Sequence, residues 1–165
     1  MEATQVTIPT TRCCSSLPDL EVPMINTMVT CLGIEHRKLD DLNMQLAFAA
    51  TRLASDPDAA AANQRALQVW DEIRHDLWSH LQIEDELVFS WGPAHHPISD
   101  TLLDSLKSER QEMRKLMAAL REPQTAGDRG VFAHTLLALA RMLDSHVERH
   151  DGEVLPSILR ALFHM

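Results

Sequence analysis

Histidine and acidic residues recur four positions apart in two separate parts of the sequence. His80 is followed by Glu84, and His146 is followed by His150. Successive residues of an α-helix are rotated by about 100°, so side chains four positions apart differ by only about 40° and face the same neighbour. Imidazole nitrogens and carboxylate oxygens are both common metal ligands. Each spacing therefore predicts two donors that could share one cation.

The two pairs belong to an internal repeat. The segment HLQIEDELVFS, which starts at His80, aligns with HVERHDGEVLP, which starts at His146. The aligned pairs are His80 with His146, Glu84 with His150 and Asp85 with Asp151. The sequence thus predicts two similar halves, each contributing donors to the same region.

The segments that precede these motifs align as well. EHRKLDDLNMQL, from Glu35, lies over ERQEMRKLMAAL, from Glu109, so that His36 is paired with Arg110. His36 falls within a stripe of apolar residues at helical spacing, and Arg110 lies at or beside such a stripe. Both side chains are therefore expected to face the interior.

Four amphipathic helices are expected to position these side chains. Apolar residues recur at helical intervals in four stretches, about 24–55, 66–91, 99–121 and 132–155. Turns that contain proline or glycine separate the stretches, and Pro156 should interrupt the last one and leave a short amphipathic tail, 157–163. Four long helices with short links predict an all-α fold, an up-down-up-down four-helix bundle.

The composition agrees with one helical domain. The chain has 165 residues, of which 45% are hydrophobic and only five are glycine, so it can form one substantial core and favours helix. Residues 1–22 are rich in Thr, Ser and Pro and lack periodicity, which predicts a flexible N-terminal arm ahead of a bundle over 23–165. Cys13 and Cys14 fall in this arm and are interpreted as ordinary reduced thiols.

The charge limits the kinds of partner. A net charge of -9 argues against nucleic acid or an anionic membrane, since both attract concentrated Lys and Arg. No apolar run approaches the roughly 18 residues of a membrane helix, and the N-terminus lacks the basic and then hydrophobic order of a secretion signal. A cytoplasmic protein is expected.

Each of these polar residues also has a purely structural explanation. A histidine on an apolar stripe can be a hydrogen-bonded core residue, and Glu84 could neutralise Arg110. An unpaired buried ion costs roughly several kcal/mol, however, and one shared cation would remove this cost for the whole set. His146 and Asp151 differ by about 140° and could converge only if the helix loosens, which Gly152 would allow. The other histidines fall off the shared stripe and are expected to be solvated or bonded locally: His75, His95, His96, His134 and His164.

The motifs resemble those of the hemerythrin and HHE cation-binding family over about 24–156. That family has a His on helix one, His-x-x-x-Glu on helix two, a His on helix three, and His-x-x-x-Glu or a His with a later Asp on helix four. The resemblance implies a non-heme iron protein that binds or reacts with a small ligand such as dioxygen, nitric oxide or peroxide. The implied metal ligands are His36, His80, Glu84, His146 and Asp151, with His150 as an added imidazole.

Two positions depart from the family pattern. Arg110 stands where the family has its third-helix His, and His150 stands where many members have Glu. A guanidinium is protonated at any ordinary pH and cannot ligate, so the centre could be di-iron or mononuclear. Arg110 is expected to tune or gate the site, either by pairing with Glu84 or Asp151 or by hydrogen-bonding a ligand.

Several functions remain open at this stage. The ligand types alone do not choose the metal, so zinc and manganese are alternatives to iron, and paired core histidines could also serve heme. The bundle could store or sense metal without turnover. It could also be a metal-free interaction scaffold in which Arg110 replaces the charge of the cation, so whether the protein is an enzyme is left open.

Overall fold

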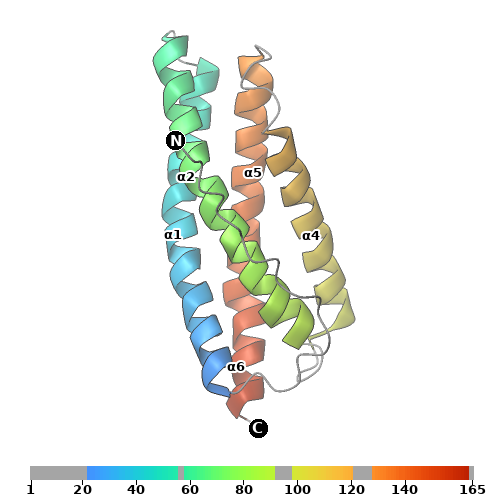
Figure 1. Cartoon of the computed structure of the whole chain (residues 1–165). Helices are drawn as coiled ribbons and strands as arrows, with labels where there is room; N and C mark the ends of the chain where they lie inside the picture. The colour runs from blue at the N-terminus through green and yellow to red at the C-terminus, as the bar shows by residue number, and fades with distance from the viewer. Residues whose placement is uncertain (1–21, 56–57, 92–97, 121–127, 164–165) are drawn as a thin grey trace, which may run out of the picture.

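The computed structural model in Figure 1 describes four stretches of the chain, 22–55, 58–91, 98–120 and 128–163. Helices make up this part of the chain, and it contains no strand. Apart from Val22, the expected N-terminal arm lies outside the described residues, and so do Cys13 and Cys14. The expected all-α class is confirmed for the described part of the chain.

The described part of the chain forms four long helices, two short π-helical segments and a last short helix. The long helices are α1 (Val22–Ser55), α2 (Ala59–Glu84), α4 (Asp100–Ala119) and α5 (Arg129–Arg149). The shorter elements are η1 (Asp85–Trp91), η2 (His150–Val154) and α6 (Leu155–Phe163). Since η1 continues α2 and η2 continues α5, the widened turns occur at equivalent places of the internal repeat.

Side-chain caps set where three of the helices begin. The Ser99 side chain accepts a hydrogen bond from the backbone N–H of Leu102 and starts α4 at the predicted place. Asp128 caps α5 through Val131, so α5 begins three residues before the first apolar position of its predicted stripe. Asp58 caps α2 in the same way. The apolar stripes therefore predicted the helices themselves but underestimated α2 and α5 at their N-termini.

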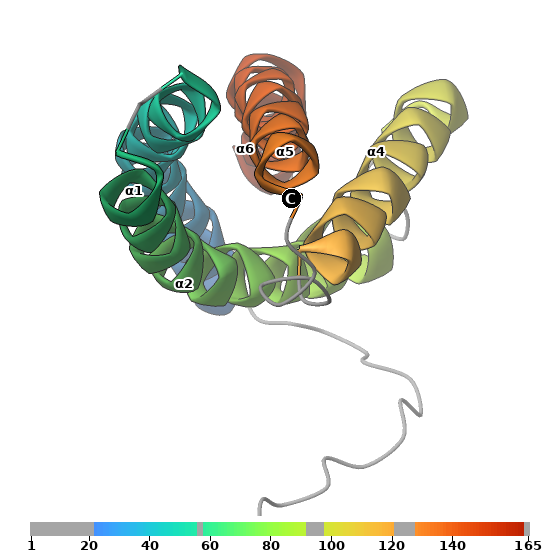
Figure 2. The ribbon, with the colours of Figure 1, turned by 90° about the horizontal axis from the view of Figure 1, so that it is seen from above.

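The long helices lie side by side (Figure 1). Helix α1 packs against both α2 and α5, and α5 also packs against α4. Seen from above, α5 lies between α1 and α4, while α2 passes obliquely across the other side (Figure 2). Residues far apart in the sequence thus face one interior. None of the described helices is long and apolar enough to cross a membrane.

The apolar interior is divided into two clusters along the helices. One cluster includes Leu39, Leu46, Leu77, Met113 and Leu139. The other includes Leu32, Leu87, Leu106, Val154 and Ile158. Between them lies a set of buried polar side chains, called here the polar layer: His36, His80, Glu84, Arg110, His146 and His150. Because apolar side chains cover this layer on both sides, it is shielded from water.

Candidate metal centre

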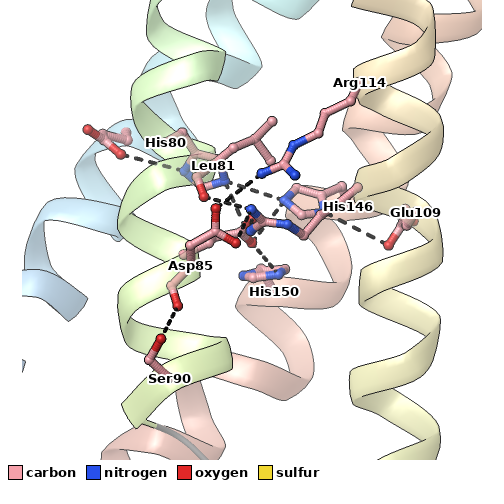
Figure 3. Close-up of polar contacts among 11 residues, drawn as sticks. His80, Leu81, Asp85, Ser90, Glu109, Arg114, His146 and His150 are labelled. Carbon is pink, nitrogen blue, oxygen red and sulfur yellow. Dashed lines mark hydrogen bonds and ion pairs between the residues drawn. The ribbon is translucent and has the colours of Figure 1, made fainter. Parts of the chain in front are cut away.

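Four imidazoles and one carboxylate meet in the polar layer. His36 comes from α1, His80 and Glu84 from the end of α2, His146 from α5, and His150 from η2, and all five side chains are fully buried. Figure 3 shows His80, His146 and His150 pointing toward one another. Their ring centroids lie 4.4 Å apart for His146 and His150 and 5.6 Å apart for His80 and His146. The two halves of the repeat therefore contribute to a single cluster.

Glu84 is the central member of the cluster. Its Oε1 atom lies 2.6 Å from His150 Nε2, 3.1 Å from His146 Nε2 and 3.9 Å from His80 Nε2. His80 Nε2 and His146 Nε2 are in turn 3.4 Å apart. The ligand atoms of His80, Glu84 and His146 all fall within 4.8 Å of one another, a spacing that one metal ion could bridge.

Several of these atoms are buried without a hydrogen bond. Within the described part of the chain this holds for Glu84 Oε1, His150 Nε2 and His36 Nε2. The contact between Glu84 and His150 is short but lacks hydrogen-bond alignment. Leaving buried polar atoms unsatisfied is costly in an apolar surrounding. Their convergence is what a bound cation would explain, so the donor set fits a metal.

Carboxylates lie behind three of the imidazoles. Asp151 Oδ1 is 2.6 Å from His36 Nδ1 and Glu35 Oε2 is 3.5 Å from His80 Nδ1. Glu109 Oε2 stands 3.8 Å from His146 Nδ1, as Figure 3 shows. In metal sites such outer carboxylates fix the ring orientation, so that the other nitrogen faces the ion.

Glu35 and Glu109 were not predicted as part of the site. The signal was present, because the two residues are equivalent in the repeat and directly precede His36 and Arg110. Their side chains keep some exposure, 27% for Glu35 and 12% for Glu109, so neither belongs to an apolar stripe. Hydrophobic periodicity could therefore not find them.

Arg110 enters the layer from α4. Its Nη1 donates to Glu84 Oε2 at 2.5 Å, and its Nη2 donates to Asp85 Oδ1 at 2.6 Å and to the carbonyl of Leu81 at 2.8 Å. The guanidinium also lies over the ring of Phe89, 4.8 Å from its centroid. Both terminal nitrogens of the guanidinium are thus engaged, and the ion pair with Glu84 considered from the sequence is present.

Charge in the centre is set by burial and by these contacts. Burial would raise the pKa of the Glu84 carboxyl, but His146 and His150 outweigh it and hold that pKa well below its ordinary value. Burial would lower the pKa of His146, but Glu109 and Glu84 raise it to about 9. For His150 burial wins over the contact with Glu84, and the pKa falls to about 4.

These shifts define the metal-free state at neutral pH. Glu84 is ionised, His146 carries a proton and His150 is neutral. Burial also lowers the pKa of His36 and outweighs the hydrogen bond to the Asp151 carboxylate, which raises it. Among these four groups, only His146 must therefore release a proton before its ring nitrogen could ligate.

The remaining predicted donor, Asp151, lies at the edge of the centre. Its side chain is 54% exposed and contacts the outer nitrogen of His36 rather than the cluster around Glu84. The expected loosening of the helix does occur, because η2 begins at His150. Gly152 lies within η2, as the expectation required, but η1 has the same widened turn with Glu86 at the equivalent position.

The family of the chain follows from this site and from one comparison. No curated protein and no solved structure matches the chain. The family model of the hemerythrin HHE cation binding domain matches residues 27–158, a segment that contains the whole polar layer. That domain implies binding of a metal cation, typically iron. The chain therefore belongs to the hemerythrin HHE cation-binding family.

Proposed function

We propose that this protein is an up-down-up-down four-helix bundle that holds non-heme iron in its polar layer and binds or reacts with a small ligand there. The observation that carries the proposal is the convergence of three ring Nε2 atoms on Glu84 Oε1. Glu84 Oε1 and His150 Nε2 are buried there without a hydrogen bond. His80, Glu84 and His146 would hold the metal, with His150 and His36 completing the set. Bound iron would supply redox chemistry and affinity for dioxygen, nitric oxide or peroxide.

The residues around the metal would each have a separate task. Asp151, Glu35 and Glu109 would orient their imidazoles from outside. The two apolar clusters would exclude water, which strengthens every charge interaction within the layer. Arg110 would hold Glu84 in place through its Oε2 atom and leave Oε1 for the metal.

The second candidate is a bundle that stores or senses metal without turnover, or one that binds no metal. The ion pair between Arg110 and Glu84 favours the metal-free reading, because it already neutralises the buried carboxylate. It does not account for the unsatisfied nitrogens of His36 and His150. Heme fits less well than iron, because Glu84 lies beside the two closest ring nitrogens, where a porphyrin would need space.

The surroundings of the protein are proposed from its charge. A net charge of -9 favours a small ligand over nucleic acid or an anionic membrane as partner. The cytoplasmic location expected from the sequence stays a prediction.

Metal content and an optical spectrum test the proposal. Full-length protein purified from iron-replete cells should contain iron, and its spectrum should change when nitric oxide is added without oxygen. His80→Ala should lose most of the metal, because the variant removes a ligand on α2. His75→Ala is the matched control, since His75 lies on the same helix with its side chain exposed. Equal iron in both variants, or none in the wild-type protein, would reject the proposal.

A further inference from the structure

We infer that the centre holds one metal ion per chain and that Arg110 occupies the place of a second. The inference rests on the proposed function and decides between its mononuclear and di-iron forms. It starts from the equivalence of His36 and Arg110 in the internal repeat.

The equivalence extends to the contacts of the two side chains. His36 of the first half contacts Asp151 of the second half at 2.6 Å. Arg110 of the second half contacts Asp85 of the first half, also at 2.6 Å. Asp85 and Asp151 are themselves aligned. The guanidinium of Arg110 therefore stands where a symmetric molecule would place a second His36-like imidazole.

Arg110 disfavours a second metal ion in two ways. It carries a permanent positive charge and has no lone pair to donate. It also engages Glu84 Oε2, the oxygen with which Glu84 could have bridged to another metal. Both nitrogen ends of the guanidinium are held, by Glu84, Asp85 and the Leu81 carbonyl, so the side chain is not free to turn away.

More positive charge surrounds this side of the centre. A surface pocket beside Arg110 is lined by Lys107 and Arg114 as well as by Asp85. Arg114 donates to Asp85 Oδ2 at 3.1 Å, and Asp85 is the only acidic side chain among the described residues that line the pocket. A second divalent cation here would thus meet three basic groups and one shared carboxylate.

Three of the remaining donors, from His80, Glu84 and His146, have the spacing of a single ion. Metal bonds of about 2.1 Å place neighbouring donors roughly 3.0–3.4 Å apart and opposite donors roughly 4.2 Å apart. Around Glu84 Oε1 the distances to the Nε2 atoms of His150, His146 and His80 are 2.6, 3.1 and 3.9 Å. The two Nε2 atoms of His80 and His146 are 3.4 Å apart. The donors of His80, Glu84 and His146 therefore match one coordination shell, whereas the 2.6 Å from Glu84 Oε1 to His150 Nε2 is shorter than two ligands of one ion would keep.

Metal stoichiometry tests the inference. Metal-free, full-length protein is loaded with ferrous iron without oxygen and, in a parallel sample, with zinc; unbound metal is removed, and metal and protein are measured. We expect one ion per chain with either metal. Two ions per chain would overturn the inference and leave the proposed function standing. No bound metal would reject the proposed function itself.

Substitution of Arg110 tests its role separately. Arg110→His should raise the stoichiometry from one ion toward two, while Lys115→His, a control on the same helix whose exposed side chain pairs with Glu112 outside the pocket, should remain at one. A folded Arg110→His protein with one ion would contradict the assigned role. Should Arg110→His fail to fold, the oxidised wild-type iron protein decides: an isolated high-spin ferric signal in electron paramagnetic resonance supports one ion, and a coupled, silent ferric pair overturns it.

Discussion

The helix pair α1–α2 and the helix pair α4–α5 frame the centre with equivalent contacts but fill it with different residues. Outside, Glu35 lies behind His80 as Glu109 lies behind His146. Inside, the first half contributes an imidazole and a carboxylate, His36 and Glu84, where the second contributes a guanidinium and an imidazole, Arg110 and His150. The two differences are linked, because the added cation of one half pairs with the buried anion of the other.

This comparison indicates that the outer carboxylate contacts form with different residues in the polar layer, whereas the residues within the polar layer depend on one another. Similar outer contacts form in both halves although their partners in the layer differ in charge. The charges of Arg110 and Glu84 therefore neutralise each other locally. Substitutions at equivalent positions of the two halves should then have unequal effects on stability and metal binding.

The largest expected difference is between Glu84 and its counterpart His150. Glu84→Gln in metal-free protein leaves Arg110 and the protonated His146 buried without their shared anion. Loss of one member of a buried ion pair typically costs about 3–5 kcal/mol of unfolding free energy. His150→Gln removes a neutral ring and should cost about 1–2 kcal/mol.

Urea denaturation with a chelator present measures both values. Equal losses in the two variants would show that the charge of Glu84 does not distinguish the halves.

The pH dependence should separate His146 from His150. The pKa of His146 is raised from 6.5 to about 9, so its stabilising contribution is complete below pH 6.5 and is lost as the pH rises through 9. The pKa of His150 is lowered to about 4, so its contribution is present above pH 6.5 and is lost as the pH falls toward 4. Metal-free protein should be most stable near pH 6.5. Its free energy of unfolding should fall by on the order of 3 kcal/mol along both the acidic limb and the alkaline limb of the pH profile.

Unfolding free energies at several pH values check this expectation. His146→Gln should flatten the alkaline limb and His150→Gln the acidic limb. If both variants kept both limbs, other groups would control the pH dependence.

The aligned carboxylates Asp151 and Asp85 should differ in their effect on metal affinity. Asp151→Asn weakens the contact that orients His36 and should lower zinc affinity by about tenfold, as loss of an outer carboxylate commonly does. Asp85→Asn affects Arg110, which is not a ligand, and should change affinity by less than about threefold. Titration against a competing zinc chelator measures both. A larger effect of Asp85→Asn would mean that Arg110 controls the metal more than His36 does.

Sequence periodicity could predict which residues would be buried but not how they would meet. His36, His80 and Glu84 lie on apolar stripes, and the structure buries them. The carboxylates that lie behind the rings come from other helices, such as Glu109 behind His146, and no spacing within one helix specifies that contact. The direction in which the Asp151 side chain points depends on the widened turn of η2. The rotation of about 100° per residue in an α-helix does not describe this turn.

The smallest expected difference concerns the widened turns themselves. Gly152 in η2 is aligned with Glu86 in η1, and both turns form. A Cβ atom at Gly152 would meet no atom within 4 Å. Gly152→Ala should therefore stabilise metal-free protein by about 0.5–1 kcal/mol, because it restricts the unfolded chain without strain in the folded one. Glu86→Ala should change the unfolding free energy little, and destabilisation by Gly152→Ala in urea denaturation would show that η2, unlike η1, depends on its glycine.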